Sequence, residues 1–111
     1  MNAKNKLYEK DNYTIQKCVN IEDTLYTQLK ELTNKKYDAT ISDLINVAIE
    51  NCINNNNIKY YPKPQGEILI YRSVMLRKQN IKALQKINSE TGIAISRLIN
   101  FSIKEFLKEE E

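Results

Sequence analysis

The sequence repeats itself, and this internal repeat limits the folds open to the chain more than any other feature. The segment "ISDLINVAIENCI" at 41–53 aligns with "ISRLINFSIKEFL" at 95–107, and six of the thirteen positions are identical. In both copies the apolar residues recur with the spacing of one side of a helix. Each segment therefore predicts an amphipathic helix with a wide buried face.

The similarity continues upstream of these helices. The segments "LYTQLKEL" at 25–32 and "NIKALQKI" at 80–87 also have helical apolar spacing. Before them, "IQKCVNI" at 15–21 and "IYRSVML" at 70–76 are short, β-branched and partly alternating, which predicts strands. The upstream pairs are offset by 55 residues and the later helices by 54, so the first copy has one extra residue in a loop, where insertions are tolerated.

Each half of the chain therefore reads as strand, helix, helix, and we expect the two halves to fold together. A lone strand leaves both edges unpaired, and two helices alone have little to pack against. We predict antiparallel pairing of 15–21 with 70–76, which gives a mainly α fold class with a two-stranded antiparallel β-ribbon, arranged as an intramolecular pseudo-dimer. The chain then divides into a flexible leader at 1–13, a first unit at 14–53, a linker with an Asn run and two prolines at 54–67 and a second unit at 68–108, the two units forming one compact domain.

Composition argues against several classes of function. The chain has no His, only two Gly and no glycine-rich phosphate loop, so we expect neither an enzyme nor a bound cofactor. Cys18 and Cys52 are too few and too far apart for a metal cluster or a disulfide framework, which suits a reducing cytoplasm. No apolar run approaches the ~20 residues of a membrane span, and the first residues lack the apolar centre of a signal peptide, so we expect a soluble cytoplasmic protein.

A spacing signature links each predicted strand to the helix that follows it. An apolar residue ends the strand, and core positions of the helix follow at five, eight and eleven residues. These residues are Ile21 with Tyr26, Leu29 and Leu32, and Leu76 with Ile81, Leu84 and Ile87. A loop then leads to a second helix that opens with a Ser and an apolar pair, "SDLI" at 42–45 and "SRLI" at 96–99. This pattern resembles the ribbon-helix-helix DNA-binding family of the Arc and MetJ type, in two tandem copies that cover 15–53 and 70–107.

The resemblance implies a sequence-specific double-stranded DNA-binding protein, as a transcriptional repressor or a regulator of a plasmid or mobile element. In this family two chains usually pair their strands into a ribbon that enters the major groove, whereas here both strands would come from one chain. We therefore expect a monomer in solution, and the resemblance leaves side-by-side assembly of two chains on DNA open. The alternative is a protein-interaction module such as an antitoxin-like adaptor, whose acidic first half meets a protein partner.

Alternation along the strands separates the candidate base contacts from the core. If Val19, Ile21, Val74 and Leu76 face inward, the side chains that face outward are Gln16, Cys18, Asn20, Tyr71, Ser73 and Met75. Asn and Gln can bond adenine in a bidentate way, Ser can bond many base edges, and Met or Tyr can contact a thymine methyl. The plainer interpretation is that these are ordinary solvent-facing residues of a half-buried ribbon.

Lys17 and Arg72 fall on the inward register. Their stems could lie along the core while the charged heads reach phosphates beside the groove. Alternatively the strand register is slipped by one, so that Lys17 and Arg72 read bases while Cys18 and Ser73 turn inward.

The resemblance also implies that the start of the second helix clamps the DNA backbone, where unpaired N–H groups and the helix dipole favour phosphate. The candidate phosphate contacts are Lys17, Thr40, Ile41, Ser42, Arg72, Arg77, Lys78, Ala94, Ile95, Ser96 and Arg97. Thr40 is a good N-cap with Asp43 completing a capping box, whereas Ala94 is a poor one.

Charge distinguishes the two halves. Residues 12–53 have four Lys against six acidic residues, a net charge of −2, whereas residues 66–108 have eight basic residues against three acidic ones, a net charge of +5. We expect most of the sequence-independent affinity for DNA to come from the second half. The leader has three Lys, and it reads either as a disordered segment or as an arm that seeks phosphates.

Overall fold

The computed structural model describes residues 13–35, 38–55 and 66–110. This part of the chain is mainly helical, with one two-stranded antiparallel sheet, which confirms that level of the expected fold class. The elements in chain order are β1 (Thr14–Glu22), α2 (Asp23–Lys35), α3 (Ile41–Asn54), β2 (Leu69–Arg77), α4 (Lys78–Thr91) and α5 (Ile95–Glu109). Residues 1–12 of the expected leader and 56–65 of the expected linker lie outside the described residues.

The register of the sheet follows the sequence repeat. Cys18 lies opposite Ser73, which are the positions that the repeat aligns at an offset of 55. From there the pairing runs to Thr14 opposite Arg77 at one end and to Glu22 opposite Leu69 at the other. Both strands are therefore one residue longer at each end than the sequence pattern predicts.

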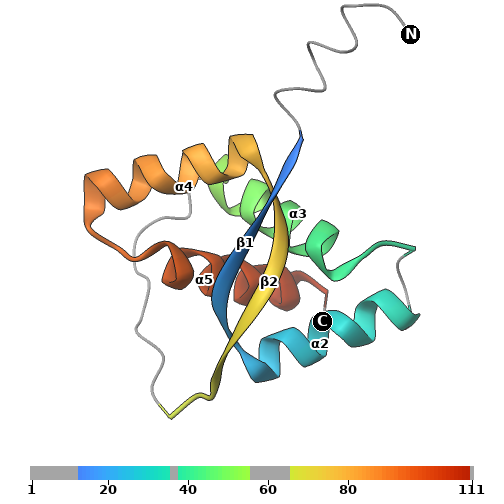
Figure 1. The fold of residues 1–111 in the computed structure, drawn as a ribbon. Helices are drawn as coiled ribbons and strands as arrows, with labels where there is room; N and C mark the ends of the chain where they lie inside the picture. The colour runs from blue at the N-terminus through green and yellow to red at the C-terminus, as the bar shows by residue number, and fades with distance from the viewer. Residues whose placement is uncertain (1–12, 36–37, 56–65, 111) are drawn as a thin grey trace, which may run out of the picture.

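One face of this ribbon is buried and the other is uncovered (Figure 1). Val19, Ile21, Val74 and Leu76 are buried beneath the ribbon, whereas the residues between them are largely accessible. The predicted alternation is confirmed, and the alternative with a register slipped by one residue is wrong. In Figure 1, α3 and α5 lie behind the ribbon, while α2 and α4 lie toward opposite ends of it.

The core lies between the ribbon and the helices, with α3 packed directly against α5. The most deeply buried side chains of these two helices occupy equivalent positions of the repeat, namely Ile45 and Ile49 in α3 with Ile99 and Ile103 in α5. Leu29 of α2 and Leu84 of α4, again equivalent, complete the core from the outer helices. Each fully buried side chain of this size stabilises the fold by roughly 1.5–3 kcal/mol, so the two aligned segments at 41–53 and 95–107 supply much of the core.

The second helices of the two halves begin differently. Thr40 caps α3 in a capping box, with the Asp43 amide 3.1 Å from Thr40 Oγ1 and the Thr40 amide 3.0 Å from Asp43 Oδ2. The residue before α5 is Ala94, and no side chain caps that helix. Both expectations about the caps are confirmed. Between α4 and α5, Gly92 adopts a φ of 76°, a left-handed conformation that suits glycine at a helix end.

Candidate nucleic-acid interface

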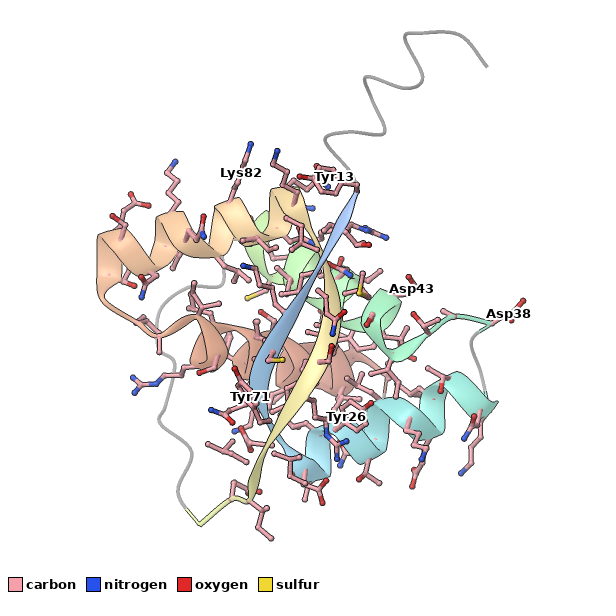
Figure 2. All side chains as sticks on the ribbon, in the orientation of Figure 1. Tyr13, Tyr26, Asp38, Asp43, Tyr71 and Lys82 are labelled. Atoms are coloured by element: carbon pink, nitrogen blue, oxygen red, sulfur yellow. The ribbon has the colours of Figure 1, made fainter. Side chains whose placement is uncertain are left out.

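The uncovered face of the ribbon presents three consecutive cross-strand pairs, which we call the ribbon face. The pairs are Gln16 with Met75, Cys18 with Ser73, and Asn20 with Tyr71. All six side chains are exposed, including Tyr71 at 69% and Met75 at 41%, although both are large and partly apolar. The six residues selected as candidate base contacts therefore lie together on one accessible surface, from which Tyr71 projects in Figure 2.

The first turn of a second helix borders each strand of the ribbon. On one side the Met75 amide of β2 donates to Ser42 Oγ in α3, at 3.0 Å. On the other side Ile95 and Ser96 of α5 line a groove of about 300 Å³ together with Lys17, Cys18 and Asn20 of β1. The ribbon face is thus flanked by two helix N-termini, where unpaired amides and the positive end of the helix dipole favour an anion.

Asn46, inside the apolar face of α3, fixes the end of β2. Its Oδ1 accepts from the Arg77 amide at 2.9 Å, and its Nδ2 donates to the carbonyls of Met75 and Ser42, both at 2.9 Å. The side chain is buried, and its amide matches one donor and one acceptor of the strand backbone. A polar side chain in the core is therefore satisfied by a strand of the other half of the sequence.

Asn100 does the same for β1. Its Oδ1 accepts from the Glu22 amide at 2.9 Å, and its Nδ2 donates to the carbonyls of Asn20 at 2.9 Å and Ser96 at 2.8 Å. Sequence reasoning did not assign this role to either Asn. The signal was present, because a polar residue that is identical in both copies interrupts an otherwise apolar helix face. These two residues hold the ribbon at a fixed position above α3 and α5.

The two candidate phosphate ligands at the centre of the strands have different surroundings. Arg72 Nη2 lies 3.1 Å from Asp23 Oδ1, and the guanidinium lies 3.7 Å from the centroid of the Tyr26 ring. Lys17, the equivalent residue on β1, is exposed and lines the groove beside α5. The difference is encoded locally, because the repeat places Lys78 and Ile81 where the first half has Asp23 and Tyr26.

The remaining charged candidates are also placed unequally. The Arg77 guanidinium turns toward α3 and bonds both carboxylate oxygens of Glu50, at 2.8 and 2.6 Å. Lys78 begins α4, where its amide donates to the Tyr13 carbonyl at 3.0 Å and its Nζ lies 5.2 Å from the centroid of the Tyr13 ring. Arg97 lies in the first turn of α5 and is partly exposed.

The helix-start candidates gather as two clusters beside the ribbon, one at each second helix. They are Thr40, Ile41 and Ser42 before and within the first turn of α3, and Ala94, Ile95 and Ser96 at the start of α5. The structure therefore brings together the ribbon face, the two helix starts and Lys17. It turns the charged ends of Arg72 and Arg77 toward carboxylates of the protein itself.

Other classes of site receive no support from the described residues. Across 13–35, 38–55 and 66–110, no group of His, Cys, Asp and Glu could hold a metal ion. Within the same ranges, no helix combines the length and the apolar character that crossing a membrane requires. Comparison with protein-family models, with curated proteins and with solved structures found no significant match.

Proposed function

We propose that this chain is a sequence-specific double-stranded DNA-binding protein of the ribbon-helix-helix type, in which the units at 14–53 and 68–108 pair as an intramolecular pseudo-dimer. The observation that carries the proposal is the ribbon face, with three uncovered cross-strand pairs between two helix N-termini. The paired-unit arrangement is supported by the register, since Cys18 lies opposite its repeat equivalent Ser73. A role in transcriptional repression or in the control of a plasmid or mobile element fits this chemistry.

The dimensions of the ribbon suit the major groove of B-DNA. A two-stranded ribbon fits a groove about 12 Å wide, and side chains on one face of a strand recur every ~6.8 Å. Three pairs therefore span about 14 Å, the length of roughly four base pairs at 3.4 Å each. The amides of Gln16 and Asn20 can bond adenine, and the Ser73 hydroxyl can donate to or accept from several base edges. Met75 and Tyr71 can contact thymine methyl groups, so A·T-containing sites are favoured.

The DNA backbone would meet the starts of α3 and α5 on either side of the groove. Amides of a helix first turn bind phosphate oxygens without sequence preference and set the depth and orientation of the ribbon. Arg97 in the first turn of α5 adds a positive charge there, whereas the equivalent residue in α3 is Asp43. The second unit is also the more basic, so it would supply most of the salt-dependent affinity.

The test uses the full chain and a pool of random DNA duplexes. Selection of bound duplexes should converge on a short consensus, and the affinity for the selected duplex should fall steeply as salt rises from 50 to 200 mM, as expected for several phosphate contacts. Arg97→Glu should weaken binding to all duplexes and reduce the salt slope by about one unit. Asn20→Ala should instead relax the preference at one base pair, by about 1–3 kcal/mol.

Lys108→Glu is the matched control for Arg97→Glu. It makes the same change of charge in the same helix, but eleven residues further along, about 16 Å away, which exceeds the ~8 Å screening length at physiological salt. Equal losses in the two variants would show that only net charge matters and would refute a clamp at the start of α5. Absence of any consensus, together with salt-insensitive binding to a protein, would favour the protein-interaction module instead.

A further inference from the structure

Two ion pairs occupy equivalent positions of the repeat but have opposite polarity. At one end of the ribbon, Glu22 Oε2 of β1 lies 3.2 Å from Lys104 Nζ of α5. At the other end, Arg77 Nη1 of β2 lies 2.6 Å from Glu50 Oε2 of α3. Position 22 aligns with 77 and position 50 with 104 in the repeat. Each pair therefore joins the strand end of one half to the second helix of the other half, with the signs exchanged.

These four side chains are not freely solvated. The Glu22 side chain is only 2% exposed, and those of Glu50, Arg77 and Lys104 are all partly buried. Exposed ion pairs contribute little because water screens them, but removing or reversing one partner of a buried pair is strongly destabilising. The sign of the charge at each of these positions therefore matters for which surfaces can come together.

The side chains around the two ion pairs also differ between the halves. Next to Glu50, Asn80 Nδ2 donates to Glu50 Oε2 at 2.9 Å and to Asn46 Oδ1 at 3.0 Å, so the carboxylate receives one further donor. The residue equivalent to Asn80 in the first half is Leu25, which is buried. The side-chain amide that bonds Glu50 is therefore a feature of the second half. If a first half of another chain were paired there instead, Leu25 would lie next to Glu50 in place of Asn80.

We propose that these four charges determine which halves can pair, so that a first half accepts a second half and rejects another first half. If two first halves paired in the same register, Glu22 of one chain would face Glu50 of the other. If two second halves paired, Arg77 would face Lys104. Like charges across a partly desolvated contact disfavour the wrong pairing, as in other interfaces whose charge patterns select their partner.

The Arg72–Asp23 pair contributes unequally to this selection. Between two second halves Arg72 would face Lys78, which adds repulsion, whereas between two first halves Lys17 would face Asp23, which adds attraction. Rejection of a first–first pair therefore depends mainly on Glu22 and Glu50. The partner that the charges select is the chain's own other half. The inference rests on the paired-unit arrangement proposed above and not on DNA binding.

Cys18 provides a reporter of like–like pairing. In the structure it is exposed and lies opposite Ser73, so it has no thiol across the ribbon. In a first–first pair the same register would bring Cys18 of one chain opposite Cys18 of the other. Residues that face each other across an antiparallel ladder have Cα atoms about 4.5–5.5 Å apart, within the range of a disulfide. Because Cys18 is also exposed in the native fold, the disulfide-linked dimer formed in excess of that from chains oxidised without unfolding reports first–first pairs.

The experiment refolds the full chain from denaturant at high protein concentration, oxidises it, and measures the disulfide-linked dimer on a non-reducing gel. All variants carry Cys52→Ala, so that Cys18 is the reacting thiol. The parent should give little dimer. The double variant Glu22→Arg with Lys104→Glu keeps both native ion pairs attractive but makes each half complementary to a second copy of itself. It should give about tenfold more disulfide-linked dimer than the parent. A tenfold ratio corresponds to a difference in pairing free energy of ~1.4 kcal/mol.

A fourfold exchange is the matched control. Adding Arg77→Glu and Glu50→Lys to the first exchange reverses every charge, so unlike halves are again favoured and the dimer should return to the parent level. The exchange of Arg77→Glu with Glu50→Lys alone is an independent second variant, expected to behave like the first and available if that one folds poorly. The proposal is overturned if the exchange variants form no more dimer than the parent, or if the fourfold exchange leaves the dimer high. No DNA enters the assay, so its outcome is separate from the outcome of the DNA-binding test.

Discussion

Replacement of Asn100 by alanine tests whether the buried asparagine of the repeat holds the ribbon on the helices. The substitution removes the acceptor of the Glu22 amide and the donor to the Asn20 carbonyl, bonds of 2.9 Å each. The Ser96 carbonyl loses a second donor but keeps its place in the helical i to i−4 ladder. Two strand groups are therefore left without their side-chain partner.

The expected loss can be worked out from these two groups. A buried polar group left without a partner costs roughly 1–3 kcal/mol. The Glu22 residue is 2% exposed, so its amide should incur the larger part of this cost, whereas Asn20 is exposed and its carbonyl can bond water. We expect Asn100→Ala to lower the free energy of unfolding by about 3 kcal/mol, and the melting temperature of a domain of this size by roughly 10–20 °C.

Urea unfolding followed by far-UV circular dichroism measures the change, and Asn34→Ala is the matched control. Asn34 lies on the exposed surface of α2, where the same substitution should change stability by less than ~0.5 kcal/mol. If Asn100→Ala destabilises the chain by no more than the control does, the asparagine does not bind the strand to the helix as argued. A large loss accompanied by a changed urea slope would mean that the variant lost its compact state rather than two bonds.

The remaining predictions concern the helix caps and the strand register. Thr40→Ala should destabilise the chain by about 1 kcal/mol, because it removes the N-cap of α3. Ala94→Ser should stabilise the chain by up to a similar amount, because the new hydroxyl can accept from an amide in the first turn of α5. If urea unfolding showed that Thr40→Ala costs nothing or that Ala94→Ser adds nothing, the argued difference between the two caps would be contradicted. Ser73→Cys should form an intramolecular disulfide with Cys18, since the two residues lie opposite each other. Under oxidising conditions it should raise the free energy of unfolding by roughly 2–4 kcal/mol, measured by urea unfolding. Mass spectrometry that found the new thiol unpaired after oxidation would show that the register is different.

Local periodicity is what made the fold accessible from the sequence. The alternation of Val19 and Ile21 with Cys18 and Asn20 indicated the buried face of the ribbon. The apolar spacing around Leu29 and Leu84 indicated the buried faces of the outer helices. The Thr40 cap was readable for the same reason, since a capping box involves residues only three apart. Each of these features depends on short-range geometry that one segment carries by itself.

The features that escaped prediction are tertiary. Arg72 and Arg77 have the residue type of phosphate ligands, but the fold brings Asp23 and Glu50 from distant segments against their guanidinium groups. Asn46 and Asn100 appear misplaced on an apolar helix face until the opposite strand supplies the matching backbone groups. The sequence gives the charge and polarity of each side chain. Its partner, however, is set by the fold, which brings together residues that are 27 to 80 positions apart in the chain.

The departures from symmetry at the two helix starts and at Lys17 and Arg72 act in one direction. On the side formed by β2 and α3, the Arg72 charge is countered by Asp23, and Asp43 both occupies the first turn of α3 and would repel an anion. On the side formed by β1 and α5, Lys17 is exposed, and the first turn of α5 has no side-chain cap. Backbone amides that have no side-chain acceptor favour phosphate, and so do nearby cations. The proposed DNA contact would therefore be stronger on the side formed by β1 and α5. A homodimer must treat its two half-sites alike, whereas a single chain with these differences would, under the proposed function, suit an asymmetric site.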